Sequence, residues 1–77
     1  MNVSEAEFEY IKEGIAKDMV ILLVKEHGMQ ITDALDALYT SDTFCKLSDP
    51  RTKLYIQSPR YVLQFLLSEL ERGKIEE

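Results

Sequence analysis

The feature that most constrains this fold is a run of six apolar residues, Met19–Val24, that continues a spaced series of large apolar side chains. Phe8, Ile11 and Ile15 precede the run at three- and four-residue steps, the spacing of one helical face. A strand over Met19–Val24 is the alternative, but no turn residues separate the run from Ile15. The pattern therefore predicts one helix that is amphipathic at its start and apolar nearly all round at its end.

Both ends of this helix carry terminal signals. Ser4 and Glu7 form a capping-box pair, in which each side chain accepts a hydrogen bond from the other residue's backbone N–H. Gly28 suits the left-handed residue that commonly follows a helix, and His27 in the last turn complements the helix dipole. We expect the helix to span about residues 4–27, with Gly14 marking a bend or a close helix contact.

The clearest boundary in the chain is Ser58-Pro59, a helix cap followed by proline at the first helical position. It predicts a C-terminal helix over about residues 59–72, which Gly73 ends. One narrow stripe of this helix is polar. The rest of its circumference is mostly apolar, and its side chains are Tyr61, Val62, Leu63, Phe65, Leu66, Leu67 and Leu70.

Shorter helices are expected between the two long ones. Thr32 is expected to cap a second helix whose buried face comprises Ala34, Leu35, Leu38 and Tyr39. The segment Thr40-Ser41-Asp42 interrupts that pattern and predicts the cap of a further short helix, ended by Ser48-Asp49-Pro50. Residues 52–56 fit either a helical turn or a short extended piece.

Together these elements predict a single all-α domain, residues 1–77, built as a small bundle of three to five helices. A core of this size is marginal, and one cysteine cannot form an internal disulfide to reinforce it. The two long helices carry more apolar surface than a single covered side requires. We therefore expect a homodimer or a complex with a protein partner. The alternative is that the short helices cover this surface within one chain.

The charge of the chain limits the classes of partner. A net charge of −5 argues against a surface built for nucleic acid or anionic lipid. Residues 46–60 are a local exception, because they carry four bases against the single acid Asp49. This basic segment suits an acidic patch on a partner or on the chain itself, and a solvated charged loop is the simpler interpretation.

The sequence also predicts a cytoplasmic protein. The N-terminus lacks the basic and apolar regions of a signal peptide. The longest apolar run is far shorter than the roughly 20 residues of a membrane span, so no contact with the membrane interior is expected. A single unpaired cysteine, Cys45, fits a reducing compartment.

We expect neither an enzyme nor a bound metal or cofactor. One histidine and one cysteine cannot assemble a Cys/His zinc site. Cys45 is expected to be a small buried hydrophobic residue next to Phe44 and Leu47. A nucleophile pair of Cys45 and His27 stays open, because such pairs meet in space, but no local motif supplies an orienting group or an oxyanion site.

Residues 32–47 resemble a helix-turn-helix in outline, and a small DNA-binding transcriptional regulator is therefore the alternative function. The second helix of the segment would offer Asp42, Thr43 and Lys46, and Asp33 and Asp36 precede it. These acids carry the wrong charge for phosphate groups, so nucleic acid is the less favoured partner.

Three short elements follow one another over residues 39–62: Ser41-Asp42-Thr43-Phe44-Cys45-Lys46-Leu47, Thr52-Lys53-Leu54-Tyr55, and Ser58-Pro59 at the start of a final helix. In this order they resemble a group of short, uncharacterised, helical bacterial proteins that carry a domain of unknown function. The resemblance implies a helical fold and brings no assigned activity. Related small proteins are suspected of lying in toxin–antitoxin or mobile-element operons, which favours an interaction role.

The leading prediction is a non-enzymatic protein–protein interaction module. Tyrosine combines an apolar ring with a polar tip and is enriched at interfaces, and basic side chains flank two tyrosines of the basic segment. The predicted partner-binding residues are Lys46, Arg51, Lys53, Tyr55, Arg60 and Tyr61. The alternative is that Tyr55 and Tyr61 pack in the core with their hydroxyls bonded to the backbone.

Overall fold

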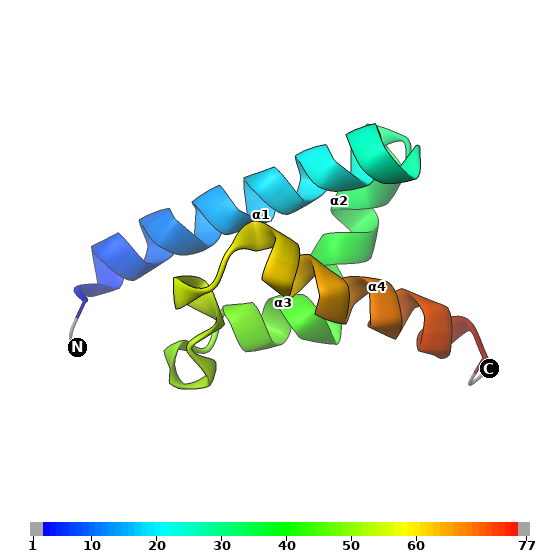
Figure 1. The fold of residues 1–77 in the computed structure, drawn as a ribbon. Helices are drawn as coiled ribbons and strands as arrows, with labels where there is room; N and C mark the ends of the chain where they lie inside the picture. Colours follow the sequence, from blue (N-terminus) through cyan, green and yellow to red (C-terminus); the bar gives the residue numbers. More distant parts are fainter. Residues whose placement is uncertain (1–2, 76–77) are drawn as a thin grey trace.

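The computed structural model describes residues 3–75, and within that range the chain is helical with no strand (Figure 1). Four α-helices follow one another: α1 (Glu5–His27), α2 (Ile31–Tyr39), α3 (Asp42–Leu47) and α4 (Pro59–Ile75). Two 3₁₀ turns, η1 (Pro50–Thr52) and η2 (Leu54–Ile56), connect α3 to α4. The predicted fold class, a small bundle with long first and last helices and short ones between, is confirmed.

Both predicted ends of α1 are confirmed. The Ser4 hydroxyl accepts from the Glu7 N–H at 3.1 Å, and the Glu7 carboxylate accepts from the Ser4 N–H at 2.8 Å. Gly28 follows the helix with a φ of 69°, which only glycine adopts without strain. Gly14 lies on the exposed side of α1, and a Cβ added there would meet nothing within 4 Å. The predicted close helix contact at Gly14 is therefore wrong within this chain.

The prediction for α2 is only partly right. The helix begins at Ile31, after Gln30, which makes no side-chain cap, so Thr32 lies inside the first turn and cannot be the cap. Ala34 and Leu38 are buried as expected. Leu35 and Tyr39 are exposed instead, because this short helix packs only one narrow face on its neighbours.

The start of α3 is confirmed, because the Ser41 hydroxyl accepts from the Phe44 N–H at 3.0 Å. The predicted burial of Cys45 is wrong, since the structure exposes this thiol. Thr43 and Leu47, four residues apart, form the buried side of α3. Cys45 lies midway between them in sequence and therefore points away from the core.

Residues 52–56, which fitted two conformations, form helical turns. Lys53 separates η1 from η2 in the left-handed conformation, with a φ of 60°. The Thr52 hydroxyl lies 2.6 Å from the Lys46 carbonyl oxygen and accepts from the Leu54 N–H at 3.3 Å. This side chain therefore ties both turns to the end of α3.

The start of α4 is confirmed and its end is not. The Ser58 hydroxyl accepts from the Tyr61 N–H at 3.2 Å, and Pro59 occupies the first helical position. The helix continues to Ile75 and passes through Gly73, which was expected to end it. Glycine accepts the right-handed helical conformation as readily as the left-handed one, so its presence alone does not stop a helix.

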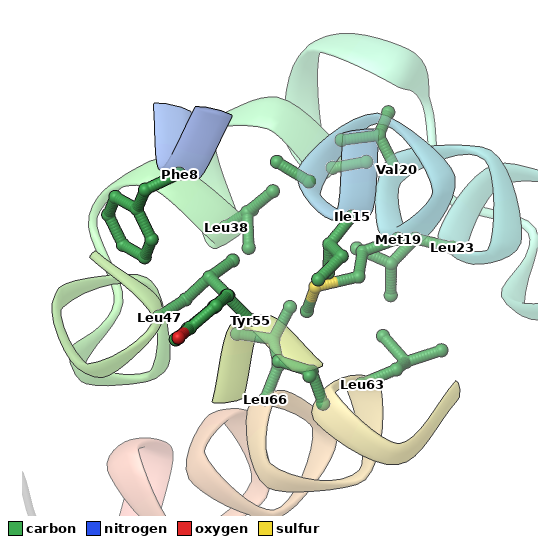
Figure 2. Packing of buried hydrophobic residues seen from close by; sticks show 13 residues of the cluster. Phe8, Ile15, Met19, Val20, Leu23, Leu38, Leu47, Tyr55, Leu63 and Leu66 are labelled. Atoms are coloured by element: carbon green, nitrogen blue, oxygen red, sulfur yellow. The ribbon is translucent and has the colours of Figure 1, made fainter. Parts of the chain in front are cut away.

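The core lies between α1 and α4, with α2, α3 and η2 closing its sides (Figures 1 and 2). Its fully buried large side chains come from all four helices: Met19, Leu23, Leu38, Leu47, Val62 and Leu66. Each contributes roughly 1.5–3 kcal/mol relative to an exposed position. The fold covers most of the Met19–Val24 run within one chain, and Ile21, at 39%, is its most exposed residue.

Candidate protein-interaction site

Tyr61 and Phe65 form an aromatic pair on the surface of α4. They are four residues apart, and their ring centroids lie 5.3 Å apart in an edge-to-face arrangement of 75°. Tyr61 is 44% exposed and Phe65 is 48% exposed. An aromatic pair that leaves this much apolar surface in water is typical of the anchors of protein interfaces.

Phe65 also lines a cavity of about 240 Å³ between α3, the two 3₁₀ turns and α4, which we call the α3–α4 hollow. Leu54 and Phe65 supply its large apolar side chains, and Lys46 and Arg72 supply positive charge. Its complete lining is Asp42, Thr43, Lys46, Thr52, Leu54, Phe65, Glu69 and Arg72. The hollow therefore offers an apolar surface next to cationic side chains.

Glu69 shapes the hollow by joining α4 to α3. Its carboxylate accepts from the N–H groups of Asp42 at 2.7 Å and Thr43 at 2.9 Å, and from the Thr43 hydroxyl at 2.8 Å. Partial burial alone would raise the pKa of Glu69, but these hydrogen bonds and the charge of Lys46 outweigh it, so the pKa lies below its ordinary value. This carboxylate is already engaged in the fold, so the charges at the hollow that a partner would meet are those of Lys46, Arg72 and Asp42.

The predicted partner-binding residues do not all gather at this site. Lys46 lines the hollow and Tyr61 lies beside it through Phe65. Tyr55 is only 8% exposed and packs edge-to-face on Phe8 at 5.1 Å, so its assignment as a surface contact is wrong (Figure 2). Burial in the core, one part of the alternative, is found for Tyr55 and not for Tyr61.

Both predicted arginines are engaged in ion pairs. Arg60 donates to both carboxylate oxygens of Glu26, at 2.9 and 2.6 Å, and joins the start of α4 to the end of α1. Arg51 binds Asp49 in the same loop, with a shortest distance of 2.9 Å. Hydrogen bonding within each pair lowers the pKa of Glu26 and of Asp49 and raises that of both arginines. Lys53 is exposed on the loop between η1 and η2.

Sequence reasoning missed Phe65, Glu69 and Arg72. One signal was available, because these residues follow Tyr61 at steps of four, four and three and therefore share a face of α4. No sequence pattern indicated that Thr52 and Leu54 line the hollow. Those residues reach the hollow because the two 3₁₀ turns fold back against α3.

The helix-turn-helix interpretation finds little support in this geometry. The segment folds as two helices, but α3 has only six residues. Its first turn, which in a DNA reader approaches base edges, is bound by the Glu69 carboxylate.

Other kinds of site are not found in the part of the chain that the structure describes. No group of three or more His, Cys, Asp or Glu side chains there could hold a metal ion. None of the helices over residues 3–75 is long and apolar enough to span a membrane. Comparison of the chain with protein-family models, with curated proteins and with solved structures finds no match.

Proposed function

We propose that the protein is a non-enzymatic interaction module that binds a protein partner through Tyr61, Phe65 and the α3–α4 hollow. The observation that carries this proposal is the half-exposed aromatic pair at the edge of an apolar, cation-bearing cavity. Aromatic side chains lose little conformational entropy on binding, and nearby cations steer and orient an acidic partner.

The partner that fits best carries an apolar side chain close to a carboxylate. The apolar group would pack against Phe65 and Leu54, and the carboxylate would meet Lys46 and Arg72 at the rim. A bidentate arginine–carboxylate pair would give the contact a direction as well as energy. The working state would then be a complex or a dimer, with the exposed thiol of Cys45 suited to a reducing compartment such as the cytoplasm.

The resemblance of residues 39–62 to helical bacterial proteins of unknown function stays a prediction. It favours an interaction role in a toxin–antitoxin or mobile-element context. The DNA-binding regulator is the weaker alternative, because Glu69 occupies the first turn of α3.

Capture from a lysate of the protein's own host tests this proposal. The double variant Tyr61→Ala, Phe65→Ala should lose a stoichiometric partner that the wild-type chain retains. The variant Asp33→Ala, Asp36→Ala changes two exposed positions of α2 that do not line the hollow, and it should keep that partner. Lys46→Glu with Arg72→Glu should also abolish capture without loss of helical content. A partner retained by all of these variants would refute the site, and salt-sensitive DNA in the eluate would favour the regulator.

A further inference from the structure

The outer face of α1 has an unusual composition for a surface helix. Tyr10, Gly14, Lys17 and Ile21 follow one another at steps of four, three and four residues, so they share one face. The core residues of α1, such as Met19, lie on the opposite side. Tyr10 is nevertheless 82% exposed, the largest value among the exposed large hydrophobic side chains, and Ile21 is 39% exposed. This face therefore exposes apolar groups at positions where a solvent-exposed helix face usually carries polar side chains.

No contact within the chain explains why a glycine occupies position 14. Glycine in the middle of a helix destabilises it relative to alanine. A Cβ at this position would meet nothing within 4 Å, so no neighbouring element of the same chain requires the absence of a side chain. Glycine in a helix is also found where a ligand or a second helix approaches closely. The open space beside Gly14 can receive a side chain from another molecule.

A shallow groove runs along this side of α1. It consists of three hollows placed end to end, because the first two share Tyr10 and Ile11, and the last two share Asp18 and Pro59. The groove extends from the first turns of α1 to the start of α4. Figure 1 shows α2, α3 and α4 on one side of α1.

The face is complementary to itself when turned end for end. Tyr10 and Gly14 are equally distant from position 12, and so are Glu7 and Lys17. In an antiparallel pair of α1 helices related by a two-fold axis at that level, each Tyr10 lies level with the second copy's Gly14, and each Glu7 with its Lys17. Ile21 then reaches the hollow lined by Val3 and Ala6. In this single register, the bulky Tyr10 thus faces the space beside Gly14, and Glu7 faces the oppositely charged Lys17.

We infer that the outer face of α1 is a homodimer interface in which two copies pack antiparallel, with each Tyr10 ring over the other's Gly14. The occupant is a second copy because the residue that protrudes and the residue that leaves space belong to the same patch, as an isologous interface requires. This inference rests on the self-association included in the proposed function. It uses a surface that contains neither Phe65 nor the α3–α4 hollow.

Sedimentation equilibrium of the full chain over a range of concentrations tests the inference. Wild-type protein should dimerise reversibly. Gly14→Leu should raise the dimer Kd at least about tenfold, because the new side chain fills the space that Tyr10 needs. Its circular dichroism should be retained, since leucine is a better helix former than glycine. Tyr10→Ala should weaken the dimer similarly, and Asp36→Leu on the exposed side of α2 should not.

Disulfide trapping tests the orientation. In a Cys45→Ser background, a mixture of Tyr10→Cys and Gly14→Cys chains should form the mixed disulfide faster than either homodisulfide. A parallel pair would favour the homodisulfides and would refute the register. A dimer that tolerates both Gly14→Leu and Tyr10→Ala would refute the α1 interface but not self-association.

A wild-type chain that stays monomeric would refute both the α1 interface and self-association. The proposed capture of a protein partner through Phe65 would be unaffected by that result.

Discussion

Glu69 on α4 binds Thr43 on α3 through two hydrogen bonds, from the backbone N–H at 2.9 Å and from the hydroxyl at 2.8 Å. The two residues are 26 positions apart, so this contact closes a long loop through the two 3₁₀ turns. α3 is too short to be stable alone, and its N-terminal N–H groups need acceptors. Glu69 supplies one from another helix, together with the local cap from Ser41.

Replacing Glu69 should therefore lower stability. Glu69→Ala leaves the N–H groups of Asp42 and Thr43 without their acceptor, and we expect the free energy of unfolding to fall by about 1–2 kcal/mol. Glu71→Ala, at an exposed position on the same helix, should change it by less than about 0.5 kcal/mol. Urea denaturation followed by circular dichroism measures both. Equal effects of the two substitutions would contradict the capping role.

The same contact should depend on pH. The pKa of Glu69 is lower in the folded chain than its ordinary value of 4.5, so its contribution is present above that value and is lost as the pH falls through the folded pKa. The difference in unfolding free energy between wild type and Glu69→Ala should narrow as the pH falls from about 6 to about 3. Glu7, Glu26 and Asp49 also have lowered pKa values, but both proteins contain them and their effects cancel. A difference that stays constant with pH would exclude an ionised Glu69 as the acceptor.

Two adjacent residues of α4 should respond very differently to truncation. Leu66 is fully buried, and Leu66→Ala should lower the free energy of unfolding by about 2–5 kcal/mol, because it leaves a cavity. Phe65 is 48% exposed, and Phe65→Ala should cost less than about 1.5 kcal/mol. Thermal or urea denaturation of the two variants decides the matter. A comparable loss in both would mean that Phe65 belongs to the core and is unavailable to a partner.

The exposed Cys45 should react in the native state. We expect a thiol-specific disulfide reagent to modify one equivalent per folded chain at a rate close to that of the denatured chain, since no packing shields the sulfur. Helical content should be unchanged after modification. A reaction that waits for unfolding, shown by a rate that rises with denaturant, would place this thiol inside the protein or inside an interface.

The helix starts could be predicted from the sequence because the groups that form them are neighbours in the chain. The Ser4–Glu7 box, the Ser41 cap and Ser58-Pro59 each act within four residues, as does Gly28 at the end of α1. The two wrong predictions, a helix cap at Thr32 and a helix end at Gly73, also concern local signals. Several residues near each position are compatible with a helix boundary and with a helix interior. In the candidate site, sequence reasoning named Lys46 and Tyr61, and the spacing along α4 could also have indicated the face that Tyr61 shares with Phe65, Glu69 and Arg72.

By itself, then, the sequence determined the class of fold and the placement of its long helices, through periodicity and short-range hydrogen bonds. The tertiary structure alone decided which aromatic residues are buried. Tyr55 meets Phe8, 47 positions earlier, whereas Tyr61 turns outward to pair with Phe65. The tertiary structure also brought the Glu69 carboxylate of α4 to the first turn of α3 and left Cys45 exposed to water. These outcomes depend on how helices that are far apart in the chain pack against one another. Such packing cannot be inferred from the composition and the residue spacing of the sequence.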